Sequence, residues 1–116
     1  MLRVLVEVEL AALAAEVVGL AVIFRGVARG GDLHALVCVA GSSKAAALAD
    51  LDVEQWDQTF ALNVRSVWLM AQAARASLAR TRGSITAVAS MSGVQPHPGL
   101  GAYSPAKAAL IMLCRQ

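Results

Sequence analysis

The stretch Ala35-Leu36-Val37-Cys38-Val39-Ala40-Gly41 decides the fold class of this 116-residue chain. An unbroken apolar run of this length, closed by two small residues, is typical of a strand buried on both faces of a parallel sheet. A second β-branched and apolar run, residues 85–89, stops at Ser90. Two such strands need a crossover connection between them, and the intervening sequence predicts a helix.

The predicted crossover helix covers residues 53–80. Asp52 is suited to the N-cap position, with Gln55 three residues later as in a capping box. Gly83 ends the helix. Apolar residues recur at spacings of three and four along one face: Trp56, Phe60, Val64, Val67, Ala71, Ala74 and Leu78. Trp68 lies off this stripe, which predicts a second apolar face.

The remaining segments complete an alternating pattern. Residues 4–28 have helical spacing. Residues 42–50 read as a loop with one helical turn, residues 91–101 as a loop, and residues 102–115 as a helix with Pro105 in its first turn. The order helix, strand, helix, strand, helix predicts an α/β fold with a parallel sheet, in one domain spanning residues 1–116.

Composition narrows the function classes. The chain is 58% hydrophobic and 16% charged, which excludes intrinsic disorder, and two cysteines cannot form a disulfide scaffold. Residues 1–57 carry a net charge of −4 and residues 58–116 carry +6. The basic half holds no cluster of lysine and arginine interleaved with aromatic residues, so we expect no nucleic-acid partner.

The most apolar segment, residues 10–24, is shorter than a membrane-spanning helix and contains Glu16. Acidic residues precede it, whereas a signal peptide begins with basic ones. We therefore expect a cytoplasmic protein without a membrane partner, in which Cys38 and Cys114 are reduced thiols.

Candidate chemistry centres on Tyr103 and Lys107, which stand four residues apart and so share one helix face. A tyrosine has a reference pKa of about 10. A nearby ammonium favours the phenolate, which makes the pair a plausible proton donor and acceptor. Ser90 follows a predicted parallel strand, at the sheet edge where active sites of open α/β sheets lie. Asn63 interrupts the long helix, as a kink, a water ligand or a solvent-facing residue.

In this order the residues resemble the short-chain dehydrogenase/reductase family over residues 33–116. Residues 36–41 resemble its strand-end Asn-Asn-Ala-Gly motif, and Asn63 its helix asparagine. Ser90 resembles its catalytic serine, with Ser92 as the competitor. Tyr103-Ser104-Pro105-Ala106-Lys107 matches its Tyr-x-x-x-Lys signature. Residues 1–32 are predicted to be helical and resemble the family only weakly.

The resemblance implies an oxidoreductase that uses NAD or NADP to interconvert a small-molecule alcohol and ketone. Tyr103 would transfer the proton, Lys107 would bind the nicotinamide ribose, and Ser90 would orient the substrate oxygen. Asn63 would hold a water of a proton relay, and Ala40 and Gly41 would line the adenosine side of the cofactor.

The chain also departs from the family. The nearest approach to a glycine-rich phosphate loop, residues 26–32, precedes a strand instead of following one. Cys38 and Val39 replace the two asparagines of the strand-end motif. These departures predict a partial Rossmann-like doubly wound sheet, truncated at both ends, without the first strand, the glycine-rich loop and the last strands. Such a fragment is expected to bind cofactor weakly.

Other functions fit less well. The sequence at residues 89–93 is not the Gly-x-Ser-x-Gly elbow of a serine hydrolase, and the histidines and cysteines lack metal-ligand spacing. The main alternative is a non-catalytic interaction module. In the family the helix at residues 53–80 commonly packs in a dimer, which predicts a homo-oligomer, and the additional apolar residues Trp68 and Met70 favour this.

Overall fold

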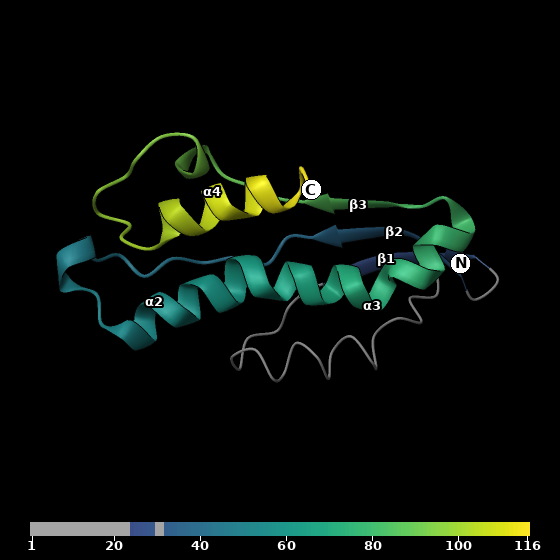
Figure 1. The fold of residues 1–116 in the computed structure, drawn as a ribbon, viewed down its shortest axis with the longest axis horizontal. Coiled ribbons are helices and arrows are strands. Elements are labelled where there is room, and N and C mark those ends of the chain that lie inside the picture. The colour runs from purple at the N-terminus through teal and green to yellow at the C-terminus, as the bar shows by residue number, and fades with distance from the viewer. Residues whose placement is uncertain (1–23, 30–31) are drawn as a thin grey trace. The chain divides into compact units, whose positions relative to one another are not determined.

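The computed structural model describes residues 24–29 and 32–116 (Figure 1). They form two compact units, each made of separate pieces of chain. The sheet unit contains the described residues up to 39 together with residues 67–88, and the helical unit contains residues 40–66 and 89–116. All six residues predicted for the site belong to the helical unit: Ala40, Gly41, Asn63, Ser90, Tyr103 and Lys107.

Three strands in the order β1-β2-β3 form the sheet. β2 (Asp32–Cys38) and β3 (Ser84–Ala87) are parallel, with Leu36 opposite Ile85. This confirms the parallel pair of strands that the sequence predicts. Within β2, Leu36 and Cys38 are buried. Val39, just beyond the strand, is 56% exposed, so the predicted apolar run is not buried along its whole length.

β1 (Phe24–Arg29) is a strand where the sequence predicts the end of a helix. It pairs antiparallel with β2, placing Arg29 opposite Asp32. The helix prediction is therefore wrong for residues 24–28, and its remainder, residues 4–23, lies outside the described residues. The sequence signal for the hairpin is the Gly30-Gly31 pair between the two strands, which is typical of a two-residue connection.

The predicted crossover helix consists of three consecutive segments. α2 (Val53–Phe60) begins at the N-cap Asp52, whose carboxylate accepts a hydrogen bond from the Gln55 N–H at 2.7 Å, as predicted. A π-helical segment, η2 (Ala61–Arg65), follows, and then α3 (Ser66–Thr81). Arg82 has a φ of +54°, and the Gly83 N–H donates to the Leu78 carbonyl at 2.8 Å, so the helix ends where Gly83 predicts.

The π segment changes which face of the helix is buried. Val67, Ala74 and Leu78 are buried as the single stripe predicts, but Trp56 is 37% exposed. Before and within the π segment the buried residues are instead Thr59, Leu62 and Asn63. A π turn holds more residues than an α turn, so positions before and after it no longer follow one 3.6-residue pattern. The prediction of one continuous stripe is therefore wrong in its first half.

The two residues predicted to extend the helix's outer apolar face separate in the structure. Trp68 is 47% exposed, whereas Met70 is 1% exposed. Met70 therefore belongs to the core and is not available to a dimer contact, contrary to the prediction. Within residues 24–29 and 32–116, no helix combines the length and apolar character required to cross a membrane.

α3 is tied to the start of β2 by hydrogen bonds. The Leu33 N–H donates to Ser77 Oγ at 2.6 Å, and Thr81 Oγ1 donates to the Leu33 carbonyl at 2.6 Å. Arg80 also pairs with Asp32 at 2.6 Å, but both side chains are exposed, so this ion pair contributes only about 0–1 kcal/mol.

The helical unit contains two short 3-10 turns, η1 (Leu48–Asp50) and η3 (Met91–Gly93), and the helix α4 (Tyr103–Leu113). η1 is the one helical turn expected within residues 42–50, and α4 is the predicted last helix with Pro105 in its first turn. A single β-bridge joins Ala46 to Leu100. This bridge brings the loop after β2 beside the residues that lead into α4.

Candidate functional site

α4 presents Tyr103 and Lys107 one turn apart. The Tyr103 N–H donates to the Leu100 carbonyl at 2.8 Å, which starts the helix at the tyrosine. The Lys107 Nζ lies 5.6 Å from the centroid of the Tyr103 ring, within the range of a cation–π contact. The predicted placement of both residues on one helix face is thus present in the structure.

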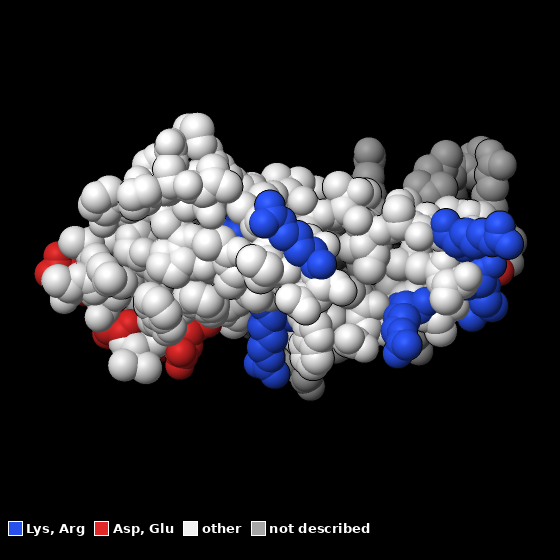
Figure 2. All heavy atoms as spheres, turned by 45° about the horizontal axis from the view of Figure 1, so that its top comes forward, with Lys and Arg blue, Asp and Glu red and all other residues white. Residues whose placement is uncertain are grey.

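Lys107 is the one charged residue among the buried residues of the described chain, with 2% of its surface exposed. Burial lowers its pKa, because an ammonium that loses its hydration is less stable than a neutral amine. On the face shown in Figure 2, several lysine and arginine side chains gather at the right-hand end and others stand apart. The helical unit thus contains a buried amine whose charged form is disfavoured by burial.

Asn63 lies in η2 and is fully buried, with 0% exposure. Its Nδ2 donates to the Ser42 carbonyl at 2.8 Å and to the Thr59 carbonyl at 2.9 Å. Its Oδ1 is buried and has no hydrogen-bond partner among the described residues. Of the three readings of this asparagine, the structure excludes the solvent-facing one and places it at a helix irregularity.

Gly41 lies against both of these side chains. A Cβ atom at this position would lie 2.6 Å from Asn63 Oδ1 and 2.9 Å from Lys107 Nζ. Both separations are too short for real Cβ contacts. Gly41 therefore lines the same small space as Asn63 and Lys107. Ala40, before it, is half-buried.

Ser90 follows β3 by three residues and begins the turn η3. Its hydroxyl oxygen accepts a hydrogen bond from the Ser92 N–H at 3.1 Å, so Ser90 caps the turn. Ser90 is half-buried, while the competing Ser92 is 7% exposed. The turn packs closely on α4, because a Cβ at Gly93 would lie 2.9 Å from the Lys107 carbonyl carbon and oxygen. Ser90 is thus connected to the Tyr103 helix through backbone packing.

These groups bring a phenol, a buried amine, a buried amide and a hydroxyl into one unit. They are suited to proton transfer and to hydrogen bonding with an oxygen-containing ligand. Among the described residues, no three histidine, cysteine, aspartate or glutamate side chains are grouped to hold a metal ion. Sequence reasoning missed the close approach of Gly41 to Lys107, for which no local pattern exists.

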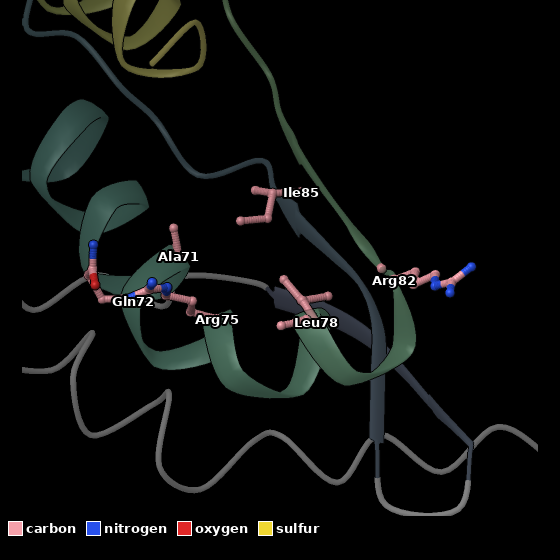
Figure 3. Close-up of a pocket in the computed structure, with 8 residues that line it drawn as sticks. Ala71, Gln72, Arg75, Leu78, Arg82 and Ile85 are labelled. Atoms are coloured by element: carbon pink, nitrogen blue, oxygen red, sulfur yellow. The ribbon is translucent and has the colours of Figure 1, made fainter.

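A pocket of about 450 Å³ lies in the sheet unit and is separate from these residues (Figure 3). α3 and β3 form it, and no residue predicted for the site lines it. The Arg82 side chain extends away from Leu78 and Ile85 in this view. Gln72 and Arg75 supply the other polar side chains of the lining.

Comparison with known proteins agrees with this arrangement. The sequence profile of a family described as short chain dehydrogenase matches residues 12–116. The chain belongs to the short-chain dehydrogenase family. Its fold is accordingly a partial Rossmann-type α/β fold, as predicted.

Three relatives illustrate the similarity. The 2-(S)-hydroxypropyl-CoM dehydrogenase 3 of Xanthobacter autotrophicus is 37% identical over 87 residues, which cover 74% of this chain and 34% of that protein. The inactive 2-(S)-hydroxypropyl-CoM dehydrogenase 2 of the same organism is 36% identical and covers 74% of this chain and 38% of its own length. The alcohol dehydrogenase of the archaeon Thermococcus sibiricus, solved in complex with 5-hydroxy-NADP, has a TM-score of 0.70 and 30% identity, covering 75% of this chain and 37% of that chain. This short-chain dehydrogenase chain thus spans little more than a third of each relative's length.

Proposed function

We propose that this chain carries the proton-transfer part of a short-chain dehydrogenase site, in a protein that uses NAD or NADP to interconvert a hydroxyl and a carbonyl group. The observation that carries the proposal is the pairing of Tyr103 and Lys107 on α4, with the Lys107 amine buried and 5.6 Å from the tyrosine ring. The substrate class that fits this chemistry is a small-molecule alcohol or ketone.

The nicotinamide supplies or accepts the hydride when it is bound. In the reductive direction, the Tyr103 hydroxyl donates its proton to the oxygen of the substrate carbonyl, and in the oxidative direction its phenolate takes that proton back. The Ser90 hydroxyl donates a hydrogen bond to the same oxygen and orients it. The Lys107 amine, when charged, stabilises the phenolate form of Tyr103. The free Oδ1 of Asn63 is an acceptor for a water that passes protons to Lys107.

The residues present fit one end of a nicotinamide dinucleotide better than the other. Tyr103 and Lys107 have donors for the hydroxyls of the nicotinamide ribose, and Ala40 and Gly41 are small enough for close approach of the cofactor on its adenosine side. The diphosphate normally lies where a glycine-rich turn joins a strand to a helix N-terminus. Among the described residues, the glycine-containing strand β1 instead pairs antiparallel with β2.

Cofactor titration tests this proposal directly. Adding NADH or NADPH to the folded chain should change the nicotinamide fluorescence until binding saturates. Lys107→Met should weaken this binding. Where alcohol oxidation is measurable, Tyr103→Phe should reduce turnover by at least about 100-fold, the usual contribution of a general acid or base. Unchanged turnover in Tyr103→Phe would remove Tyr103 from the reaction.

A second candidate function is a non-catalytic interaction module that pairs with another copy through the helix at residues 53–80. The observation that favours it is Trp68, which is 47% exposed on α3. Sedimentation of the unmodified chain and of Trp68→Gln separates the two functions. A dimer that dissociates in Trp68→Gln, in a chain without NADH binding, supports the module. A monomer contradicts it.

A further inference from the structure

Gly41 occupies a position where the structure leaves no room for a side chain. A Cβ there would lie 2.6 Å from Asn63 Oδ1, 2.9 Å from Lys107 Nζ and 3.6 Å from Lys107 Cε. Its φ lies outside the left-handed region, since Gly101 is the one glycine with positive φ among the described residues. The requirement for glycine at position 41 is therefore spatial and not conformational.

The two side chains that face Gly41 differ in their number of rotatable bonds. Asn63 is held by two hydrogen bonds from Nδ2, to the carbonyls of Ser42 and Thr59, and is fully buried. The Lys107 amine is the end of a flexible four-carbon side chain. Because the lysine side chain has more rotatable bonds than the asparagine side chain, a methyl group at position 41 is expected to displace the lysine.

We propose that Gly41 is a positioning residue that keeps the Lys107 amine buried beside Asn63 and below the Tyr103 ring. The inference rests on the proposed function, because Gly41 would act on proton transfer only through Lys107. With a methyl group at position 41, Lys107 moves toward solvent, its amine regains hydration and its distance to the Tyr103 ring changes. Glycine at this position thus sets both the ionisation and the location of the lysine.

The chain is well suited to a direct test, because it contains only two lysines, Lys44 and Lys107. Lys44 is exposed and serves as an internal reference. Carbon-13 NMR of the lysine Cε groups, followed over pH, gives one titration midpoint for each residue in the same sample. Gly41→Ala is compared with Gly99→Ala, since a Cβ at Gly99 meets no atom within 4 Å.

In Gly41→Ala the Lys107 midpoint should rise, because the displaced amine is better hydrated. In Gly99→Ala it should equal the midpoint of the unmodified chain. An unchanged or lower Lys107 midpoint in a folded Gly41→Ala sample overturns the proposal. Circular dichroism establishes that both variants are folded.

A measurement on the unmodified chain covers the case in which Gly41→Ala does not fold. The short separations at Gly41 predict a nuclear Overhauser contact between the Gly41 Hα and Lys107 Hε protons, and its absence overturns the proposal. Neither experiment contains cofactor or substrate. Their failure is therefore distinct from failure of the proposed function, which the turnover of Tyr103→Phe decides.

Discussion

Asn63 donates a hydrogen bond from Nδ2 to the main-chain carbonyl of Ser42, 2.8 Å away and 21 residues earlier in the chain. The same nitrogen donates to the Thr59 carbonyl one turn earlier in the helix. One buried amide thereby joins the π segment to the loop that follows β2. This loop contains Gly41, so the bond also fixes the glycine against Lys107.

Replacing Asn63 should destabilise the chain strongly. In Asn63→Leu the Thr59 carbonyl loses this donor in a buried place and the Ser42 carbonyl loses it in a partly buried one. An unsatisfied buried polar group costs about 1–3 kcal/mol. The free energy of unfolding, measured in urea, should fall by about 2–3 kcal/mol. Gln72→Leu, at an exposed helix position, is the control and should change it by less than about 0.5 kcal/mol. Equal effects in the two variants would contradict the role assigned to Asn63.

The N-cap of α2 makes a smaller contribution. Asp52→Ala removes the acceptor for the Gln55 N–H and should lower the free energy of unfolding by about 1 kcal/mol. Asp52→Ser keeps a capping oxygen and should retain most of that stability. Urea unfolding of both variants checks the prediction, and a Ser variant as unstable as the Ala variant would contradict it.

Lys107 should make the stability of the chain depend on pH. Burial lowers its pKa below the ordinary lysine value of 10.5, so over the interval between the folded and unfolded pKa values the unfolded chain binds more protons than the folded chain. Stability therefore rises as pH increases through this interval and gains nothing more above the unfolded value. At lower pH both states are protonated, and the full cost of the buried ammonium remains.

The matched variant for this prediction is Lys107→Met, which keeps the length of the side chain and removes the charge. Urea unfolding at a series of pH values from neutral to alkaline should show a rise for the unmodified chain that is absent or smaller in Lys107→Met. Identical pH profiles would show that the lysine is hydrated in the folded state.

Gly93 should tolerate no added methyl group, because the turn that follows Ser90 packs on the backbone of α4. A Cβ there would lie 2.8 Å from Ile111 Cδ1 and 2.9 Å from the Lys107 carbonyl. Overpacking of this kind costs about 1–3 kcal/mol. The free energy of unfolding of Gly93→Ala, measured in urea, should fall by this amount. The free energy of unfolding of Gly99→Ala should not fall in this way, because a Cβ at Gly99 lies in open space. A Gly93→Ala variant as stable as Gly99→Ala would show that η3 is free to move off α4.

Local sequence patterns were sufficient to predict several elements. Asp52 and Gln55 mark the start of α2, Gly83 marks the end of α3, and the run before Gly41 predicts a strand that pairs in parallel with the run before Ser90. These predictions depend on capping, on backbone freedom and on apolar runs, which act over a few residues. The strand at residues 24–29 was missed because its apolar spacing also fits a helix, although the Gly30-Gly31 pair after it is a local signal for a hairpin with β2.

By itself, the sequence determined the family, and the order and spacing of Asn63, Ser90, Tyr103 and Lys107 made these residues the candidates for the site. Only the tertiary structure decided that Asn63 and Lys107 are buried and that Gly41 lies against both. The physical reason is that burial is set by which distant segments pack together. A lysine four residues after a tyrosine has the same local geometry on a solvated helix as it has here, but only packing removes the water that favours the charged form of its amine.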